Sequence, residues 1–171
     1  MTTADNPSSW QRRLPPIIFS TFGFCIAMYL AFYQMHIVNS VWDPFSHDGA
    51  EKVLTSKLSQ KFPIPDALLG ALGYLLDLVL GTIGKTDRWR SQPIIVLLFG
   101  IVVSLLVLAS ILLTAAQIFF LHTTCTLCLA SAMISVAIAI LVKQEILMSI
   151  QFLHAVKKEK GSFYKALFGS K

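Results

Sequence analysis

A long stretch without charge sets the strongest limit on how this chain can fold. Between Ser91 and Val142 the 171-residue sequence contains no Asp, Glu, Lys or Arg. The whole chain is only 13% charged and 55% hydrophobic, whereas ordinary soluble domains are about 25% charged. Inside a bilayer each backbone polar group must find its partner within the protein, and a helix achieves this within one segment. The sequence therefore predicts an all-α integral membrane protein.

Four transmembrane helices fit the distribution of apolar residues. A helix that crosses a bilayer needs about 20 apolar residues. The runs that meet this length are roughly 16–40, 64–84, 93–120 and 124–143. We expect residues 1–15 to form a tail, residues 41–63 a loop between the first two spans, and residues 144–171 an amphipathic, basic tail. The expected fold is a four-helix membrane bundle without a separate soluble domain.

The basic residues predict the orientation of this bundle. Eleven of the fourteen lie in segments that a four-span chain places on one side, namely Arg12, Arg13, Lys85, Arg88, Arg90, Lys143, Lys157, Lys158, Lys160, Lys165 and Lys171. The positive-inside rule makes that side the cytoplasm, so both termini are expected there. The 41–63 loop then faces the periplasm of a bacterium, and the chain is expected in the inner membrane. This distribution argues for membrane lipid and against nucleic acid as a partner.

The motif with the most chemical content is Cys125-Thr126-Leu127-Cys128. At the start of a helix, free N–H groups and a positive partial charge favour the thiolate. The expected threading places this CxxC pair near the periplasmic side of the fourth span. Three interpretations remain open: a redox-active dithiol, a structural or vestigial disulfide, and a metal clip with His122 and His47. We expect no metal, because nothing in the sequence brings His47 close.

Two further residues lie within the expected spans. Cys25 is in the middle of the first span, where a free cysteine usually serves as a small packing residue. Asp77 is the most costly charge in the chain, because acids inside a membrane need a partner or a function. The sequence predicts pairing with Lys85 or Arg88 and leaves proton handling as the alternative.

The order of these features resembles the vitamin K epoxide reductase family. The motifs that carry the resemblance are Glu51–Ser56, Ile64–Tyr74 and Cys125–Ala132, and it covers about Pro16 to Lys143. Members of this family are four-helix membrane bundles in which a CxxC heads the fourth helix beside a quinone pocket. The resemblance therefore implies a membrane thiol–disulfide/quinone oxidoreductase with quinone as its cofactor.

The same resemblance assigns roles to individual residues. Cys128 corresponds to the thiol that faces the quinone, and Cys125 to the thiol that exchanges electrons with a partner. Ser56 and Asp66 fall where family members often place polar pocket residues, which implies quinone binding. Asp66 also follows Pro65 at the expected start of the second span, so it is a candidate helix cap.

One part of the family pattern is missing. Family members carry two further cysteines in the first loop, which relay electrons from a soluble thiol protein. Here the corresponding positions hold Trp42 and Ala50, and neither residue can exchange disulfides. We expect that a thioredoxin-like partner would supply electrons directly to Cys125, which the loss of the loop cysteines would leave more open. The alternative is a catalytically degenerate structural subunit of a larger membrane complex.

Overall fold

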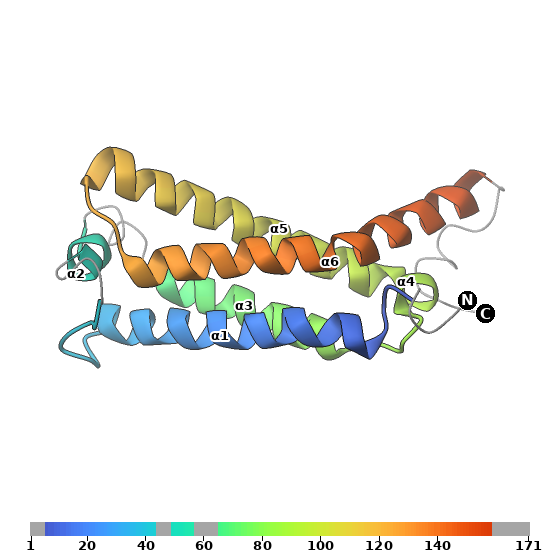
Figure 1. Ribbon diagram of the computed structural model, residues 1–171, viewed down its shortest axis with the longest axis horizontal. Coiled ribbons are helices and arrows are strands. Elements are labelled where there is room, and N and C mark those ends of the chain that lie inside the picture. Colours follow the sequence, from blue (N-terminus) through green and yellow to red (C-terminus); the bar gives the residue numbers. More distant parts are fainter. Residues whose placement is uncertain (1–5, 44–48, 57–64, 159–171) are drawn as a thin grey trace.

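The computed structural model describes residues 6–43, 49–56 and 65–158, and all regular structure in these segments is helical. The long helices are α1 (Trp10–Gln34), α3 (Asp66–Thr82), α5 (Pro93–Ala116) and α6 (Thr126–Lys158). They run along one long axis, with the short helices α2 (Gly49–Leu54) and α4 (Arg88–Ser91) at opposite ends (Figure 1). We call these the α2 end and the α4 end. A π-helical turn, η3 (Gln117–Leu121), continues α5 at the α2 end.

Three of the described helices are long and apolar enough to cross a membrane. They cover Trp10–Gln34, Pro93–Leu121 and Thr126–Val156. The second expected span corresponds to α3, which has 17 residues and therefore rises only about 26 Å. That length is at the lower limit for a bilayer core of about 30 Å. The structure thus gives three full-length candidate spans and one shorter apolar helix.

Two helices extend beyond the spans expected from sequence. α1 starts at Trp10 rather than near Pro16 and continues through two prolines. It ends at Gln34, because His36 adopts a left-handed conformation with φ 58°. α6 does not end at Lys143 but continues to Lys158, because this stretch contains no Gly or Pro to interrupt it. The last turns of α6 project beyond the bundle in Figure 1.

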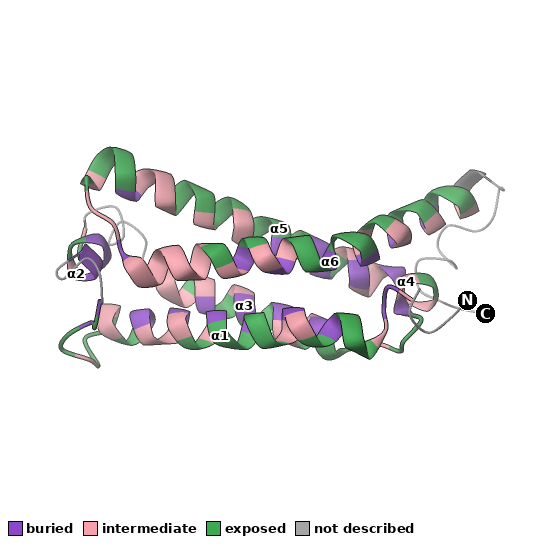
Figure 2. Ribbon diagram, in the orientation of Figure 1, coloured by how far each residue is buried: buried purple, intermediate pink, exposed green. Residues whose placement is uncertain are grey.

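Small residues allow the helices to approach closely. A Cβ atom on Gly23 of α1 would lie 2.5 Å from the ring of Tyr74 on α3, and one on Gly73 would lie 2.6 Å from Leu106 on α5. The Tyr74 hydroxyl donates a 2.6 Å hydrogen bond to the carbonyl of Ser131 on α6. Figure 2 shows burial concentrated along the middle of the bundle, whereas α5 is largely exposed where it diverges from α6 towards the α2 end.

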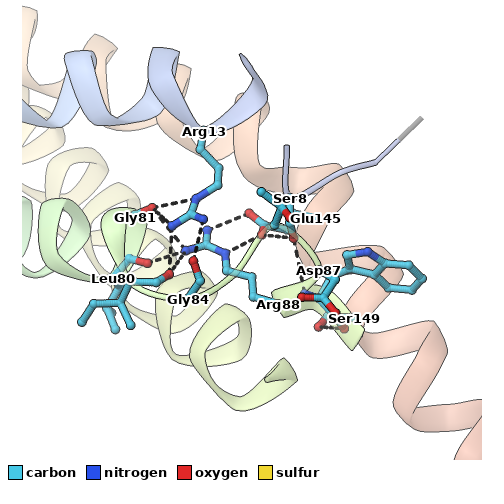
Figure 3. Close-up of polar contacts among 12 residues, drawn as sticks. Ser8, Arg13, Leu80, Gly81, Gly84, Asp87, Arg88, Glu145 and Ser149 are labelled. Atoms are coloured by element: carbon cyan, nitrogen blue, oxygen red, sulfur yellow. Dashed lines mark hydrogen bonds and ion pairs between the residues drawn. The ribbon is translucent and has the colours of Figure 1, made fainter. Parts of the chain in front are cut away.

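Two buried arginines join the helices at the α4 end (Figure 3). Arg13 of α1 donates hydrogen bonds of 2.6 and 2.9 Å to the carbonyl of Gly81, near the end of α3. Arg88 of α4 donates 2.6 and 2.9 Å bonds to the two carboxylate oxygens of Glu145 on α6 and a 2.6 Å bond to the carbonyl of Leu80. The guanidinium groups therefore satisfy carbonyls that the end of α3 leaves without helical partners.

This arrangement corrects the pairing predicted for Asp77. Arg88 forms its ion pair with Glu145, and Lys85 is exposed. Neither side-chain oxygen of Asp77 has a hydrogen-bond partner within residues 6–43, 49–56 and 65–158. The prediction was wrong because sequence distance along α3 and α4 did not reveal that α6 supplies a competing carboxylate.

Candidate functional site

The two cysteines of the CxxC lie where α6 begins, at the α2 end. Cys125 immediately precedes the helix, and Cys128 lies in its first turn. Both are free thiols, and the backbone N–H of Cys128 donates a 3.2 Å hydrogen bond to the sulfur of Cys125. The side chain of Gln117 accepts a 3.3 Å bond from the Cys125 N–H, so η3 holds the residue that precedes the helix.

The surroundings of Cys125 favour its thiolate. Its pKa lies below the ordinary value, chiefly because the Cys128 thiol donates a hydrogen bond to its sulfur, and backbone N–H groups of Cys128 and Leu127 act in the same direction. Burial and the nearby carboxylate of Asp43 oppose this shift. A lowered pKa means that the thiolate persists to lower pH than in an ordinary cysteine, which is the form that attacks disulfides.

This cause can be tested by titration. In a Cys25→Ser background, we expect Cys125 to titrate at higher pH in the Cys128→Ala variant than in the Cys128→Ser variant. A serine hydroxyl can still donate a hydrogen bond to the thiolate, whereas alanine cannot. The ultraviolet absorbance of the thiolate measures this without requiring a reagent to reach the sulfur. Equal midpoints in the two variants would show that the hydrogen bond from residue 128 is not the cause.

Cys125 is covered rather than open. It is 0% exposed and shares an apolar cluster with residues of α1, the loop and α2, namely Leu30, Val41, Ala50, Val53 and Leu54. Ala50 is itself 0% exposed, whereas Trp42 is 72% exposed. The expectation that loss of the loop cysteines opens Cys125 was therefore wrong, because an alanine at position 50 packs into the cluster that covers the sulfur.

Cys128 lines a large apolar cavity. The cavity has a volume of about 720 Å³ and lies among α1, α2, α3, α5 and the start of α6. Its lining is mostly leucine, alanine and valine, and the polar members are Ser56, Asp66, Tyr74, Ser110, Thr114, Gln117, Cys128 and Ser131. Cavities of about 300–1,000 Å³ with apolar walls and a few polar groups are typical of sites for small organic ligands.

The two residues implied for quinone binding both lie in this lining. Ser56 follows α2, and Asp66 is the first residue of α3. The Asp66 carboxylate accepts hydrogen bonds from the Gln34 side chain and from the N–H of Ala67 at 2.9 Å. Pro65 holds the N-cap position without a side-chain cap hydrogen bond. Asp66 is the first helical residue and accepts from the free N–H of Ala67, so it satisfies an N-terminal donor of α3 from inside the helix rather than from the N-cap position.

Two residues of the site were not found by sequence reasoning. Asp43 accepts a 3.2 Å hydrogen bond from the N–H of Thr126, so a loop residue far away in sequence contacts the first residue of α6. Gln117 contacts Cys125 and lines the cavity. An amide near the end of an otherwise uncharged apolar run was the available signal for Gln117, whereas only the tertiary structure reveals the role of Asp43.

The remaining candidates are exposed or lie outside the described residues. Cys25 is exposed on α1, which corrects its interpretation as a packing residue. His122 is exposed, and His47 and residues 159–171 lie outside the described residues. Within the described ranges no three His, Cys, Asp or Glu side chains gather as they would around a metal ion.

Comparison with protein families matches residues 14–143 to the Vitamin K epoxide reductase family. No curated protein matches the chain. The match covers all four long helices apart from the first turn of α1 and the last turns of α6, and it includes the cysteine pair and the cavity. The chain therefore belongs to the vitamin K epoxide reductase family of integral membrane helical bundles.

Proposed function

We propose that this protein is a thiol–quinone oxidoreductase that works with a single cysteine pair. The reduced Cys125 and Cys128 thiols lose two electrons and two protons as their sulfurs bond. A quinone in the cavity takes up the two electrons and two protons and becomes a hydroquinone. Family membership supports membrane oxidoreductase chemistry, and the finer assignment to these residues is our proposal.

One observation carries this proposal. Cys128 lines a cavity of about 720 Å³, whereas Cys125 is fully buried. The exposed leucines of α3 and α5 that line the cavity include Leu72 and Leu105, so an apolar ligand has a route from the side of the bundle. The Ser56 hydroxyl would donate a hydrogen bond to a quinone oxygen. The Asp66 carboxylate would accept one from a hydroquinone hydroxyl.

The proposed orientation follows from the basic residues. Both termini and the α4 end would face the cytoplasm of a bacterial inner membrane, and the α2 end would face the periplasm. A thioredoxin-like protein on that side would supply electrons. Because Cys125 is 0% exposed, such a partner reaches it only if the cluster of α1, loop and α2 residues that covers it opens, and exchange requires this access.

The test is a single turnover of purified protein in lipid nanodiscs. In a Cys25→Ser background, the reduced protein mixed with a soluble quinone is expected to form one Cys125–Cys128 disulfide for each hydroquinone. Mass spectrometry of alkylated peptides measures the disulfide, and absorbance measures the hydroquinone. Either Cys125→Ala or Cys128→Ala is expected to lower hydroquinone formation to the rate without protein. A reduced cysteine pair that survives excess quinone would refute the proposal.

A second function is favoured by the covered position of Cys125. A structural subunit of a membrane complex would keep the bundle without needing access to this sulfur, and the end of α6 that projects beyond the bundle (Figure 1) would offer a contact surface. Native purification distinguishes the two. Stable partners in fixed stoichiometry, together with normal function of the complex in the Cys125→Ala and Cys128→Ala variants, would favour the subunit.

A further inference from the structure

A carboxylate that has no hydrogen-bond partner among the described residues lies inside the bundle. Asp77 of α3 is 1% exposed, and neither of its oxygens accepts a hydrogen bond from any described residue. The two buried arginines are already engaged, Arg88 by Glu145 and Arg13 by carbonyls of the α3 end. An ionised carboxylate buried without a partner costs several kcal/mol. A buried acid in this position is instead expected to carry a proton.

The register of α1 against α3 shows what faces this carboxylate. Gly23 of α1 packs against Tyr74 of α3, and Ile17 of α1 packs against Gly81 of α3. The order of the contacts is reversed along the two helices, so they are antiparallel. Residues midway between these two contacts therefore face each other across the interface.

Ser20 and Asp77 are the residues midway between those contacts. Ser20 is also 1% exposed, and its hydroxyl has no hydrogen-bond partner in the described ranges. Buried polar groups in folded proteins almost always have partners, and an exception calls for an explanation. Two such exceptions on facing helices identify a polar site within the bundle, and acids inside a membrane commonly mark proton or ion pathways.

The site adjoins the proposed quinone cavity through Tyr74. Tyr74 and Asp77 are one helical turn apart on the same face of α3, which places their Cβ atoms about 5–6 Å apart. The Tyr74 hydroxyl donates to the Ser131 carbonyl at 2.6 Å and lies 3.0 Å from the Ser131 hydroxyl. Tyr74, Ser131 and Cys128 all line the cavity, so a proton on Asp77 is separated from the cavity by one tyrosine.

We propose that Asp77 is an internal proton-exchange site for the quinone cavity. It holds a proton as a neutral carboxylic acid and passes it to Tyr74, directly or through one water, while Tyr74 passes its own proton to an oxygen of the reduced quinone. The carboxylate then takes up one of the two protons released as the thiols of Cys125 and Cys128 form their disulfide, and the other thiol proton goes to the second oxygen of the reduced quinone. Electrons and protons balance within the cysteines, the quinone and Asp77. This inference rests on the proposed quinone function.

The chemical surroundings of Asp77 leave few other routes for this proton. α5 contains no charged residue. At the α4 end, Arg88 is paired with Glu145, and Arg13 donates to the carbonyl of Gly81 near the end of α3. The titratable groups that line the cavity are Asp66, Tyr74 and Cys128. On α3, Tyr74 is about one helical turn from Asp77 and Asp66 is about three turns away, so Tyr74 is the group through which the proposed route runs.

Infrared spectroscopy tests the proton on Asp77 directly. The protein would carry Cys125→Ser and Cys128→Ser, which prevents thiol chemistry, and would bind quinone or hydroquinone in nanodiscs. The difference spectrum between the two forms is expected to contain the carbonyl band of a protonated carboxylic acid, which shifts in heavy water. Asp77→Asn is expected to remove this band. Ser104→Ala, which removes a hydroxyl bonded within α5, is the control and is expected to retain it.

A kinetic measurement provides the second readout. With the cysteines present, Asp77→Asn is expected to slow single-turnover hydroquinone formation at least about tenfold, or about 1.4 kcal/mol in barrier, without changing the quinone dissociation constant. Absence of the carbonyl band, or an Asp77→Asn rate equal to that of the parent protein, would overturn the inference. Because the infrared variant cannot transfer electrons, a failure of the thiol–quinone reaction would refute the proposed function separately from the proton site.

Discussion

Replacing Arg88 by alanine is expected to lower the free energy of unfolding by about 3–5 kcal/mol. The substitution leaves the 5% exposed Glu145 carboxylate without its two charge-assisted hydrogen bonds. It also removes the donor to the Leu80 carbonyl at the end of α3. Breaking a buried ion pair costs more than the pair itself contributes, because the remaining charge stays buried. Equilibrium unfolding by denaturant in detergent micelles measures the change.

Two variants control for this interpretation. Arg90 is exposed, and its guanidinium lies 5.8 Å from the centre of the Phe152 ring, so Arg90→Ala is expected to cost about 0.5–1 kcal/mol. In the double variant Arg88→Met with Glu145→Leu, no charge remains unpaired, and most of the lost stability is expected to return. If Arg88→Ala and Arg90→Ala were equally stable, the ion pair would not be what holds the α4 end together.

Cysteines introduced at positions 42 and 50 are expected to relay electrons by disulfide exchange from a soluble dithiol to the covered CxxC. Ala50 lies in the same buried cluster as Cys125, and Trp42 is exposed at the same end of the bundle. In the double variant Trp42→Cys with Ala50→Cys, we expect reduction of the Cys125–Cys128 disulfide by a soluble dithiol to accelerate at least about tenfold, or about 1.4 kcal/mol in barrier. Stopped-flow kinetics followed by alkylation measures the rate.

The matched control separates chemistry from loosening of the loop. Trp42→Ser with Ala50→Ser makes similar changes in size but cannot exchange disulfides, so its rate is expected to equal that of the parent protein. Trapping by alkylation at early times is expected to reveal a disulfide between position 50 and Cys125. Equal acceleration in the serine variant would show that access, rather than a missing thiol relay, limits the reaction.

The helical class and three of the four spans were predictable from sequence. An uncharged run from Ser91 to Val142 can satisfy its backbone in lipid only as helices, and the structure places α5 and the bundle part of α6 there. The position of the CxxC at the start of α6 was also predicted, because the uncharged run is long enough for two spans and the turn expected between them lies near His122, just before Cys125. These features depend on residues that are neighbours in the chain.

Partners that lie far apart in the chain were not predictable. The sequence indicated basic residues at a membrane boundary but did not reveal that Arg88 contacts Glu145. It suggested Arg88 as a partner for Asp77, whereas the structure pairs Arg88 with a carboxylate of α6. It also did not predict that Ala50 would cover Cys125.

By itself, then, the sequence determined an all-helical membrane bundle with a dithiol at the start of its last helix. Only the tertiary structure decided that Cys125 is covered and that Cys128 lines a cavity. It alone also decided that Asp77 and Ser20 are buried without hydrogen-bond partners among the described residues. The physical reason is that hydropathy and helix signals act over a few neighbouring residues. Burial, ion pairing and cavities are set by which helix faces meet, and that depends on how all the helices pack together.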